Sequence, residues 1–255
     1  MGKLMKYEFR KQLTSKLIVF AMLGVIEIGF FIGILADKTN LISICMVFLY
    51  LTALISMFYF GFESIFTFSN DLKTKQSYML FLVPRSAYQV VGAKILTTVI
   101  QTFAAAIAYV AVGAVDGFVL CARYGSVKQA MEAIREMLKA FTGIEIDVFE
   151  IIWLLLMVLV TWLVFITMAM FAITLSATLL ANTKSKWKGF ISFLIYIALN
   201  RFFGKIAELL LKDRMFRDGE IIMNSAAWAF VLFYVLVLVL GFLGTAYLLE
   251  KKISV

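Results

Sequence analysis

The stretch IIWLLLMVLVTWLVFITMAMFAITL, residues 151–175, decides the fold class, because it contains no charged residue. A helix needs about 20 apolar residues to cross the hydrocarbon core of a bilayer, which is roughly 30 Å thick. Five further apolar ranges lie on either side of it: 17–36, 41–68, 95–119, 189–204 and 226–249. The sequence therefore predicts an all-α membrane protein, with six transmembrane helices in a single domain over residues 1–255.

The composition of the whole chain agrees with a membrane protein. Hydrophobic residues make up 63% of it, whereas a soluble domain is about half apolar. The range 189–204 is the weakest of the spans, because it is short and is interrupted by Asn200 and Arg201. No small-residue cleavage motif follows the range 17–36, which favours a retained span over a signal peptide.

The distribution of charge predicts the topology. With the N-terminus inside, the inner segments carry 14 basic and 3 acidic residues, whereas the outer segments, counted with Asp116 and Arg201, carry 10 and 11. Lys and Arg are retained on the cytoplasmic side of membranes. We therefore expect a multi-pass protein of a bacterial cytoplasmic membrane with both termini in the cytoplasm. Because the basic residues lie between apolar spans, the net charge of +8 does not indicate nucleic-acid binding.

Several kinds of chemistry have no residues to support them. The chain has no histidine, which is the commonest metal ligand and general base. It contains no P-loop motif, so ATP binding by this chain is not expected. Cys45 and Cys121 are expected near the outer ends of helices as buried thiols, with a disulfide between them as the alternative. We predict no catalytic, cofactor or metal site in this chain.

The sequence DGFVLCAR, residues 116–123, is similar to the D-G-x-x-A-R start of membrane phosphatidyltransferases. Two extra residues separate its halves, which would turn Ala122 and Arg123 by about 200° around a helix. No later pair of spaced aspartates follows. The stretch is therefore interpreted as a polar helix end, and a lipid-modifying enzyme is not supported.

Two acidic residues lie inside apolar ranges. Glu27 is near the middle of the first span, where a buried charge costs roughly 2.5–3.5 kcal/mol on insertion scales. It is a candidate substrate-path residue, with an interhelical hydrogen bond as the alternative. Glu63 lies near the inner end of the second span, where a basic neighbour could reach it, and is a candidate structural acid.

Glycines at G-x-x-x-G spacing occur in two of the spans. Gly29 and Gly33 lie in the first span, and Gly113 and Gly117 repeat the spacing in the third. Such pairs allow two helices to approach closely.

Two amphipathic segments flank the spans. Residues 1–16 place Leu4, Met5 and Phe9 on one helical face and basic side chains opposite, which predicts a helix in the inner interface in contact with membrane lipid. A basic flank that only sets the topology is the alternative. Residues 126–141 have helical apolar spacing and predict an amphipathic helix on the outer surface, more typical of a lid than of a ligand site.

The cytoplasmic segment 69–94 contains the only proline of the chain, Pro84. Asp71 could cap a short helix that carries Tyr78, Leu80 and Phe81, an apolar content that a solvated loop does not need. Pro84 would break this helix, and Ser86 could cap the next. The pattern predicts two helices with a sharp break, held beneath the membrane.

In this order of residues the chain resembles the type-2 permeases of the ATP-binding-cassette (ABC) transporters. That family has six spans, a basic N-terminal elbow helix and a cytoplasmic coupling helix between spans two and three. Its coupling region reads as an acid, a Gly-Thr pair, two leucines, Thr-Pro and a lysine. Asp71, Leu80-Phe81, Pro84 and Lys94 follow this order, whereas Lys75-Gln76 stands in place of Gly-Thr.

The resemblance implies a permease subunit of an exporter that works by alternating access. Its partners would be an ABC ATPase subunit, which would hold ATP and Mg²⁺, and a second permease chain, identical or related. The ATPase-coupling residues would be Asp71, Lys75, Gln76, Tyr78, Leu80, Phe81 and Pro84. A stand-alone secondary transporter or a structural membrane subunit is the alternative function.

Overall fold

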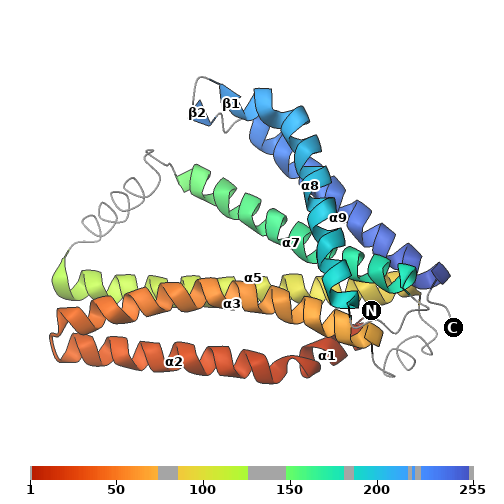
Figure 1. Ribbon diagram of the computed structural model, residues 1–255. Helices are drawn as coiled ribbons and strands as arrows, with labels where there is room; N and C mark the ends of the chain where they lie inside the picture. The colour runs from red at the N-terminus through yellow and green to blue at the C-terminus, as the bar shows by residue number, and fades with distance from the viewer. Residues whose placement is uncertain are drawn as a thin grey trace. The chain divides into compact units, whose positions relative to one another are not determined.

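A computed structural model describes residues 2–73, 86–125, 148–180, 187–217, 220–221 and 225–252. The described chain, shown in Figure 1, forms two compact units. The first unit comprises Met1–Glu63 and Ala93–Glu136, and the second comprises Ser64–Gly92 and Met137–Val255.

The first unit is built from helices. They are α1 (Gly2–Lys11), α2 (Leu13–Leu35), most of α3 (Thr39–Lys73) and most of α5 (Ala87–Tyr124). The turn after α2 has the hydrogen bonds of a Schellman motif, in which the Lys38 N–H donates to the Gly33 carbonyl at 2.9 Å. Asp37 has a φ of 49° there, a left-handed conformation that aspartate tolerates better than most residues do. This turn reverses the chain between α2 and α3.

Small residues let α2 and α3 pack closely. A Cβ atom on Gly29 would lie 3.1 Å from Cys45 Sγ, and one on Gly33 would lie 3.0 Å from Ile42 Cγ1. Around this contact Phe30, Ile34, Ile42 and Cys45 form a buried cluster. Gly113 and Gly117 share the same spacing, but a Cβ atom there would meet nothing within 4 Å. Of these two described G-x-x-x-G pairs, the first therefore marks a close contact between helices and the second does not.

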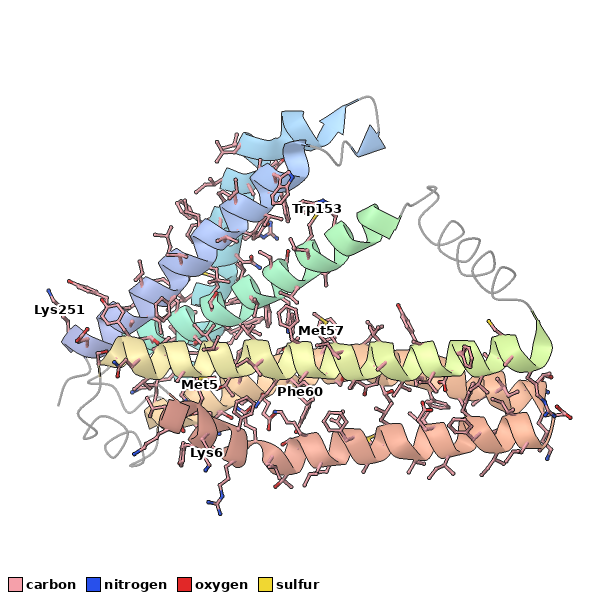
Figure 2. All side chains as sticks on the ribbon, turned by 180° about the vertical axis from the view of Figure 1, so that it is seen from behind. Met5, Lys6, Met57, Phe60, Trp153 and Lys251 are labelled. Carbon is pink, nitrogen blue, oxygen red and sulfur yellow. The ribbon has the colours of Figure 1, made fainter. Side chains whose placement is uncertain are left out.

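The second unit contains α7 (Val148–Leu179), α8 (Lys188–Met215) and α9 (Ser225–Lys252), which pack against one another. Val164, Met168 and Val237 form a buried cluster between α7 and α9. Toward the start of both helices Trp153, labelled in Figure 2, meets Trp228 edge to face at 4.3 Å between ring centroids. Such aromatic pairs add about 0.5–1.5 kcal/mol beyond the area that they bury.

A short hairpin follows α8 in the second unit. Strand β1 (Phe216–Arg217) pairs antiparallel with β2 (Glu220–Ile221). α8 continues through Asn200 and Arg201 without a break, and Asn200 Nδ2 donates to the Tyr196 hydroxyl at 3.3 Å. Polar residues weaken the hydropathy of this helix without interrupting it.

Six helices of the described chain are long and apolar enough to cross a membrane. They confirm the predicted all-helical fold with six candidate spans. Two of them exceed the thickness of the hydrocarbon core, because α3 has 35 residues and α5 has 38. At 1.5 Å per residue such helices are about 50 Å long or more. Large exposed apolar side chains on α3 and α5, among them Ile55, Phe66, Ile107 and Val110, suit contact with lipid tails.

The tight packing of α9 on α7 leads to a stability prediction. A Cβ atom on Gly244 would lie 2.7 Å from Phe171 Cε2, whereas one on Gly204 of α8 would meet nothing within 4 Å. Gly244→Leu is therefore expected to destabilise the protein by about 1–3 kcal/mol through overpacking. Gly204→Leu, the matched control, should leave the thermal midpoint unchanged in the same detergent. Equal midpoints for both variants would contradict the close contact.

Candidate functional site

Ionic contacts join the helices of the first unit at one end. Lys94 of α5 donates to Glu8 of α1 over 2.6 Å, and both side chains are at least 94% buried. Lys16 of α2 forms an ion pair with Glu63 of α3. The basic neighbour that the sequence allowed for Glu63 is thus Lys16. Because these contacts connect α1 to α5 and α2 to α3, this end of the unit is held together by charge.

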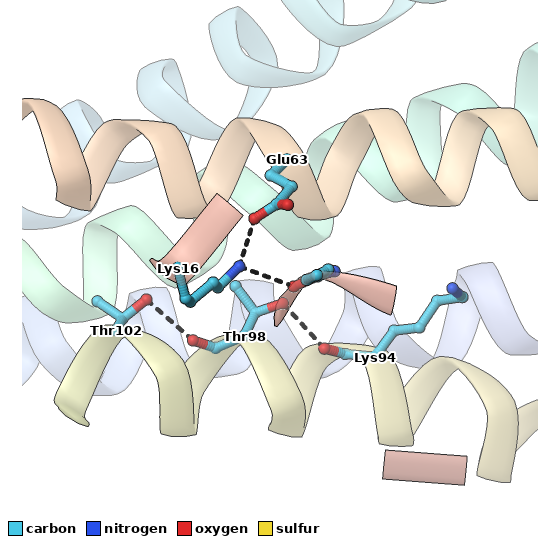
Figure 3. Close-up of polar contacts among 6 residues, drawn as sticks. Lys16, Glu63, Lys94, Thr98 and Thr102 are labelled. Carbon is cyan, nitrogen blue, oxygen red and sulfur yellow. Dashed lines mark hydrogen bonds and ion pairs between the residues drawn. The ribbon is translucent and has the colours of Figure 1, made fainter. Parts of the chain in front are cut away.

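Lys16 has further partners around its ammonium group (Figure 3). It donates to Gln12 Oε1 at 3.1 Å and lies 4.6 Å from the centroid of the Phe60 ring. The four-carbon stem of a lysine allows its charge to reach such partners from within an apolar helix. The Lys16–Glu63 pair therefore has the properties of a structural anchor.

An exposed ion pair marks the opposite end of α2 and α5. Arg123 Nη2 donates to Asp37 Oδ1 at 2.9 Å and to Asp37 Oδ2 at 3.2 Å. These residues are 86 apart in the sequence, as are Glu8 and Lys94 at the other end. The α1–α2 segment and α5 therefore run parallel, with a constant offset between residues at the same level.

This offset brings two acidic residues to nearly the same level inside the unit. Adding 86 to the number of Glu27 gives Gly113, which is one helical turn from Asp116. The two carboxyl groups are close enough to interact with each other. Glu27 is ten residues before Asp37, about 15 Å along the helix, so the pair lies at membrane depth.

The carboxyl pair lacks basic neighbours in the described chain. Asp116 is only 1% exposed, and none of Glu27 Oε1, Asp116 Oδ1 and Asp116 Oδ2 accepts a hydrogen bond from the described residues. The buried Cys45 thiol of α3 is close enough to interact electrostatically with both carboxyl groups. Buried polar groups without donors are unusual, and they commonly belong to functional sites.

A buried, largely polar face of α5 runs between the carboxyl pair and the ion pairs. It follows helical spacing and consists of Lys94, Thr98, Gln101, Ala105, Tyr109 and Asp116, all at most 8% exposed. Opposite it, α3 contributes Ser56, which is 3% exposed, and the Thr52 carbonyl, which accepts from the Tyr109 hydroxyl at 3.3 Å. We call these residues of α3 and α5 the polar row.

The threonine hydroxyl groups along this face of α5 have hydrogen-bond partners, whereas the side-chain carbonyl of Gln101 has none among the described residues. Thr98 Oγ1 donates to the Lys94 carbonyl at 2.9 Å, and Thr102 Oγ1, which lies beside the row on α5, donates to the Thr98 carbonyl at 2.9 Å (Figure 3). Threonine hydroxyls in helices commonly donate back to the preceding turn in this way. Gln101 Oε1, in contrast, is buried and accepts no hydrogen bond from the described residues. The row therefore retains an open acceptor between its two charged ends.

Of the seven predicted coupling residues, only Asp71 is described. Asp71 is buried near the end of α3. Lys75, Gln76, Tyr78, Leu80, Phe81 and Pro84 lie outside the described residues, as does the predicted outer helix 126–141. Among the described residues, no group of three or more Cys, Asp or Glu could hold a metal ion. Cys45 and Cys121 are both free.

Sequence reasoning singled out Glu27 but missed the residue that faces it. Asp116 was interpreted as part of a polar helix end, and Glu8 was not singled out. The spacing of Lys94, Thr98, Gln101, Tyr109 and Asp116 on one face of α5 was a signal for a buried polar row.

Comparison of the chain with protein-family models, curated proteins and solved structures finds no match.

Proposed function

We propose that this chain is the membrane permease subunit of an ATP-driven transporter, with an exporter's direction of transport. The observation that carries the proposal is the length of α3 beyond its ion pair. The helix continues for ten residues from Glu63 to Lys73, about 15 Å beyond the Lys16–Glu63 contact. A helix of this length can carry the segment that follows it clear of the hydrocarbon core, where a partner could bind it.

The N-terminal helix supports the same function. On α1 the basic residues Lys3, Lys6 and Arg10 are exposed, whereas Leu4 and Phe9 are half-buried. Helices of this kind lie in the membrane interface, with their basic residues toward anionic lipid. The buried Glu8–Lys94 ion pair would fix such an elbow helix to α5.

The working transporter would contain two permease chains and two ATPase subunits. ATP and Mg²⁺ would bind to the ATPase subunits, and closure of their dimer would push on the coupling segments 69–94. Rigid-body rotation of the helices would then alternate access between the two sides of the membrane. In this scheme the permease transmits force and forms the path, and hydrolysis takes place on its partner.

A stand-alone secondary transporter is the second candidate function. The observation that favours it is the Glu27–Asp116 carboxyl pair, because buried ionisable residues in membrane spans mark ion or substrate pathways. Such a protein would transport without an ATPase. The two functions therefore differ in their partners.

Purification of the tagged chain from native membranes in a mild detergent tests the proposal. We expect a P-loop ATPase and a second permease chain to copurify in equal numbers, with ATP hydrolysis in the complex. A tagged six-span protein that is unrelated to transport and expressed at the same level serves as the control. If the chain is isolated without any ATPase, and reconstituted chain alone transports, the secondary transporter is the correct function.

The topology can be tested by cysteine labelling in intact cells. In a background without Cys45 and Cys121, a cysteine at Lys128 should react with a membrane-impermeant maleimide, and a cysteine at Lys186 should react only after permeabilisation. This result is expected because the basic residues around Lys186 should remain in the cytoplasm. The reverse labelling pattern would invert the topology.

A further inference from the structure

We propose that the first unit binds a proton on the Glu27–Asp116 carboxyl pair, and that the polar row connects this site to the end of the unit marked by Lys16 and Glu63. The site lies within one chain and requires neither ATP nor an ATPase. The proton site is therefore independent of the function proposed above, and the test of the site can fail or succeed whether or not the chain works with an ATPase.

Glu27 and Asp116 lie close together inside the first unit. Ion pairs at both ends of the α1–α2 segment and α5 have the same offset of 86 residues, which places Glu27 within a helical turn of Asp116. Two carboxyl groups at the same level inside the unit can form a hydrogen bond only when one of them carries a proton, because two carboxylates can only accept. Like charges close together among buried side chains also repel, which favours a proton on one of the two groups.

The surroundings of the pair are formed by α2, α3 and α5. From α3, the buried Cys45 thiol faces it, and from α2 and α5 the two acids face each other. No Lys or Arg among the described residues forms an ion pair with either acid, and both Asp116 oxygens are buried without a donor. The proton is thus the only positive charge that the described part of the unit supplies to the pair.

Access to the pair runs along the polar row. Between the pair and the Lys16–Glu63 end, the polar row provides the Tyr109 hydroxyl, the Gln101 amide and the Ser56 hydroxyl. Gln101 Oε1 accepts no hydrogen bond from the described residues and is free to accept one from a water molecule. Water molecules between these groups would let a proton move by successive hydrogen-bond exchange, with no oxidation or reduction. When the proton moves to the next oxygen or water molecule in the row, the carboxyl group that held it becomes a carboxylate.

Infrared spectroscopy of the full chain in lipid nanodiscs tests the site. A buried carboxylic acid gives a C=O stretching band that shifts in D₂O, and we expect this band at neutral pH. It should disappear in the double variant Glu27→Gln/Asp116→Asn. Each single variant keeps one carboxyl group and should shift the band, because the hydrogen bond between two carboxyl groups is lost. Asp37→Asn, which removes an exposed acid of the same unit, should leave the band unchanged.

Access is tested by the rate at which the band shifts after transfer to D₂O. Gln101→Leu interrupts the polar row and should slow this shift severalfold, whereas Ile100→Val, one residue away and 40% exposed, should not. Thermal midpoints in detergent establish that the variants are folded. A band that persists in the double variant, or no band at neutral pH in the unaltered chain, overturns the proton site. Loss of the band on adding NaCl but not choline chloride overturns it in favour of a sodium site, and an unchanged rate in Gln101→Leu overturns the access route.

Discussion

Glu8→Gln is expected to lower the free energy of unfolding of the protein by about 3–5 kcal/mol. The change removes the carboxylate of Glu8 from a buried ion pair, while the Lys94 ammonium stays among buried side chains. Breaking a buried pair on one side has an effect of this size, because the remaining charge stays out of water and loses its attraction to the group that was removed. Thermal unfolding in detergent, followed by circular dichroism, measures the loss.

The other ion pairs of the unit serve as graded controls for this prediction. Glu63→Gln should have a smaller effect than Glu8→Gln, because both side chains of the Lys16–Glu63 pair are 14% exposed. Asp37→Asn should change the free energy by about 0–1 kcal/mol, because the Asp37–Arg123 pair is largely exposed. The order of the effects should therefore follow burial.

Removing both charges shows whether the loss of stability in Glu8→Gln comes from the remaining buried charge or from changed packing. The double variant Glu8→Leu/Lys94→Met should recover most of the loss, because a buried ion pair replaced by apolar residues is often neutral in stability. A double variant that remains as unstable as Glu8→Gln would show that the pair supplies specificity as well as charge balance. Glu8→Gln with unaltered stability would contradict the buried contact between α1 and α5.

The fold class could be predicted from the sequence because hydropathy depends on local composition alone. Five of the six apolar ranges fall within a helix, and the range 17–36 ends one residue beyond α2. Helix α8 is continuous through Asn200 and Arg201, although these residues lower its hydropathy. The ends of the helices were harder to predict. α3 and α5 extend well past their apolar ranges, since a helix can continue into water when its residues retain helical propensity.

Contacts between helices could not be predicted in the same way. Glu8 and Lys94 are 86 residues apart, and nothing local in either segment fixes the register between α1 and α5. Gly29–Gly33 and Gly113–Gly117 have the same spacing, yet only the first pair packs closely against another helix. Local spacing shows which residues share a face, whereas the neighbour of that face depends on the whole bundle. The pairing of Glu27 with Asp116 is of this second kind.

Replacing both Tyr78 and Phe81 with Ala is the second change with a large expected effect, and it rests on the proposed ATP-driven function. The double variant should insert and fold normally but lose its ATPase partner on purification. Aromatic side chains that fill a pocket often carry a large share of the binding energy of an interface, so the loss should reach several kcal/mol. A loss of about 3 kcal/mol weakens binding more than a hundredfold.

Tyr78 and Phe81 lie in the part of the sequence where a partner could bind. These residues follow α3, a helix that extends past the Lys16–Glu63 ion pair to Lys73, on the side predicted to be cytoplasmic. Tyr78, Leu80 and Phe81 give the segment 69–94 more apolar area than a solvated loop needs. Pro84 fixes φ and would let the segment transmit force as a rigid piece.

Lys75→Ala is the control for the docking prediction, because an exposed ion pair contributes only about 0–1 kcal/mol. This variant should retain the ATPase through purification and keep its transport activity. The measurement is the ratio of ATPase to permease after affinity purification, together with the transport per ATP hydrolysed. If Tyr78→Ala/Phe81→Ala retains the ATPase at the ratio of the unaltered chain and transports as much per ATP, the coupling contact lies elsewhere, since aromatic anchors of an interface cannot be removed without a loss of binding energy.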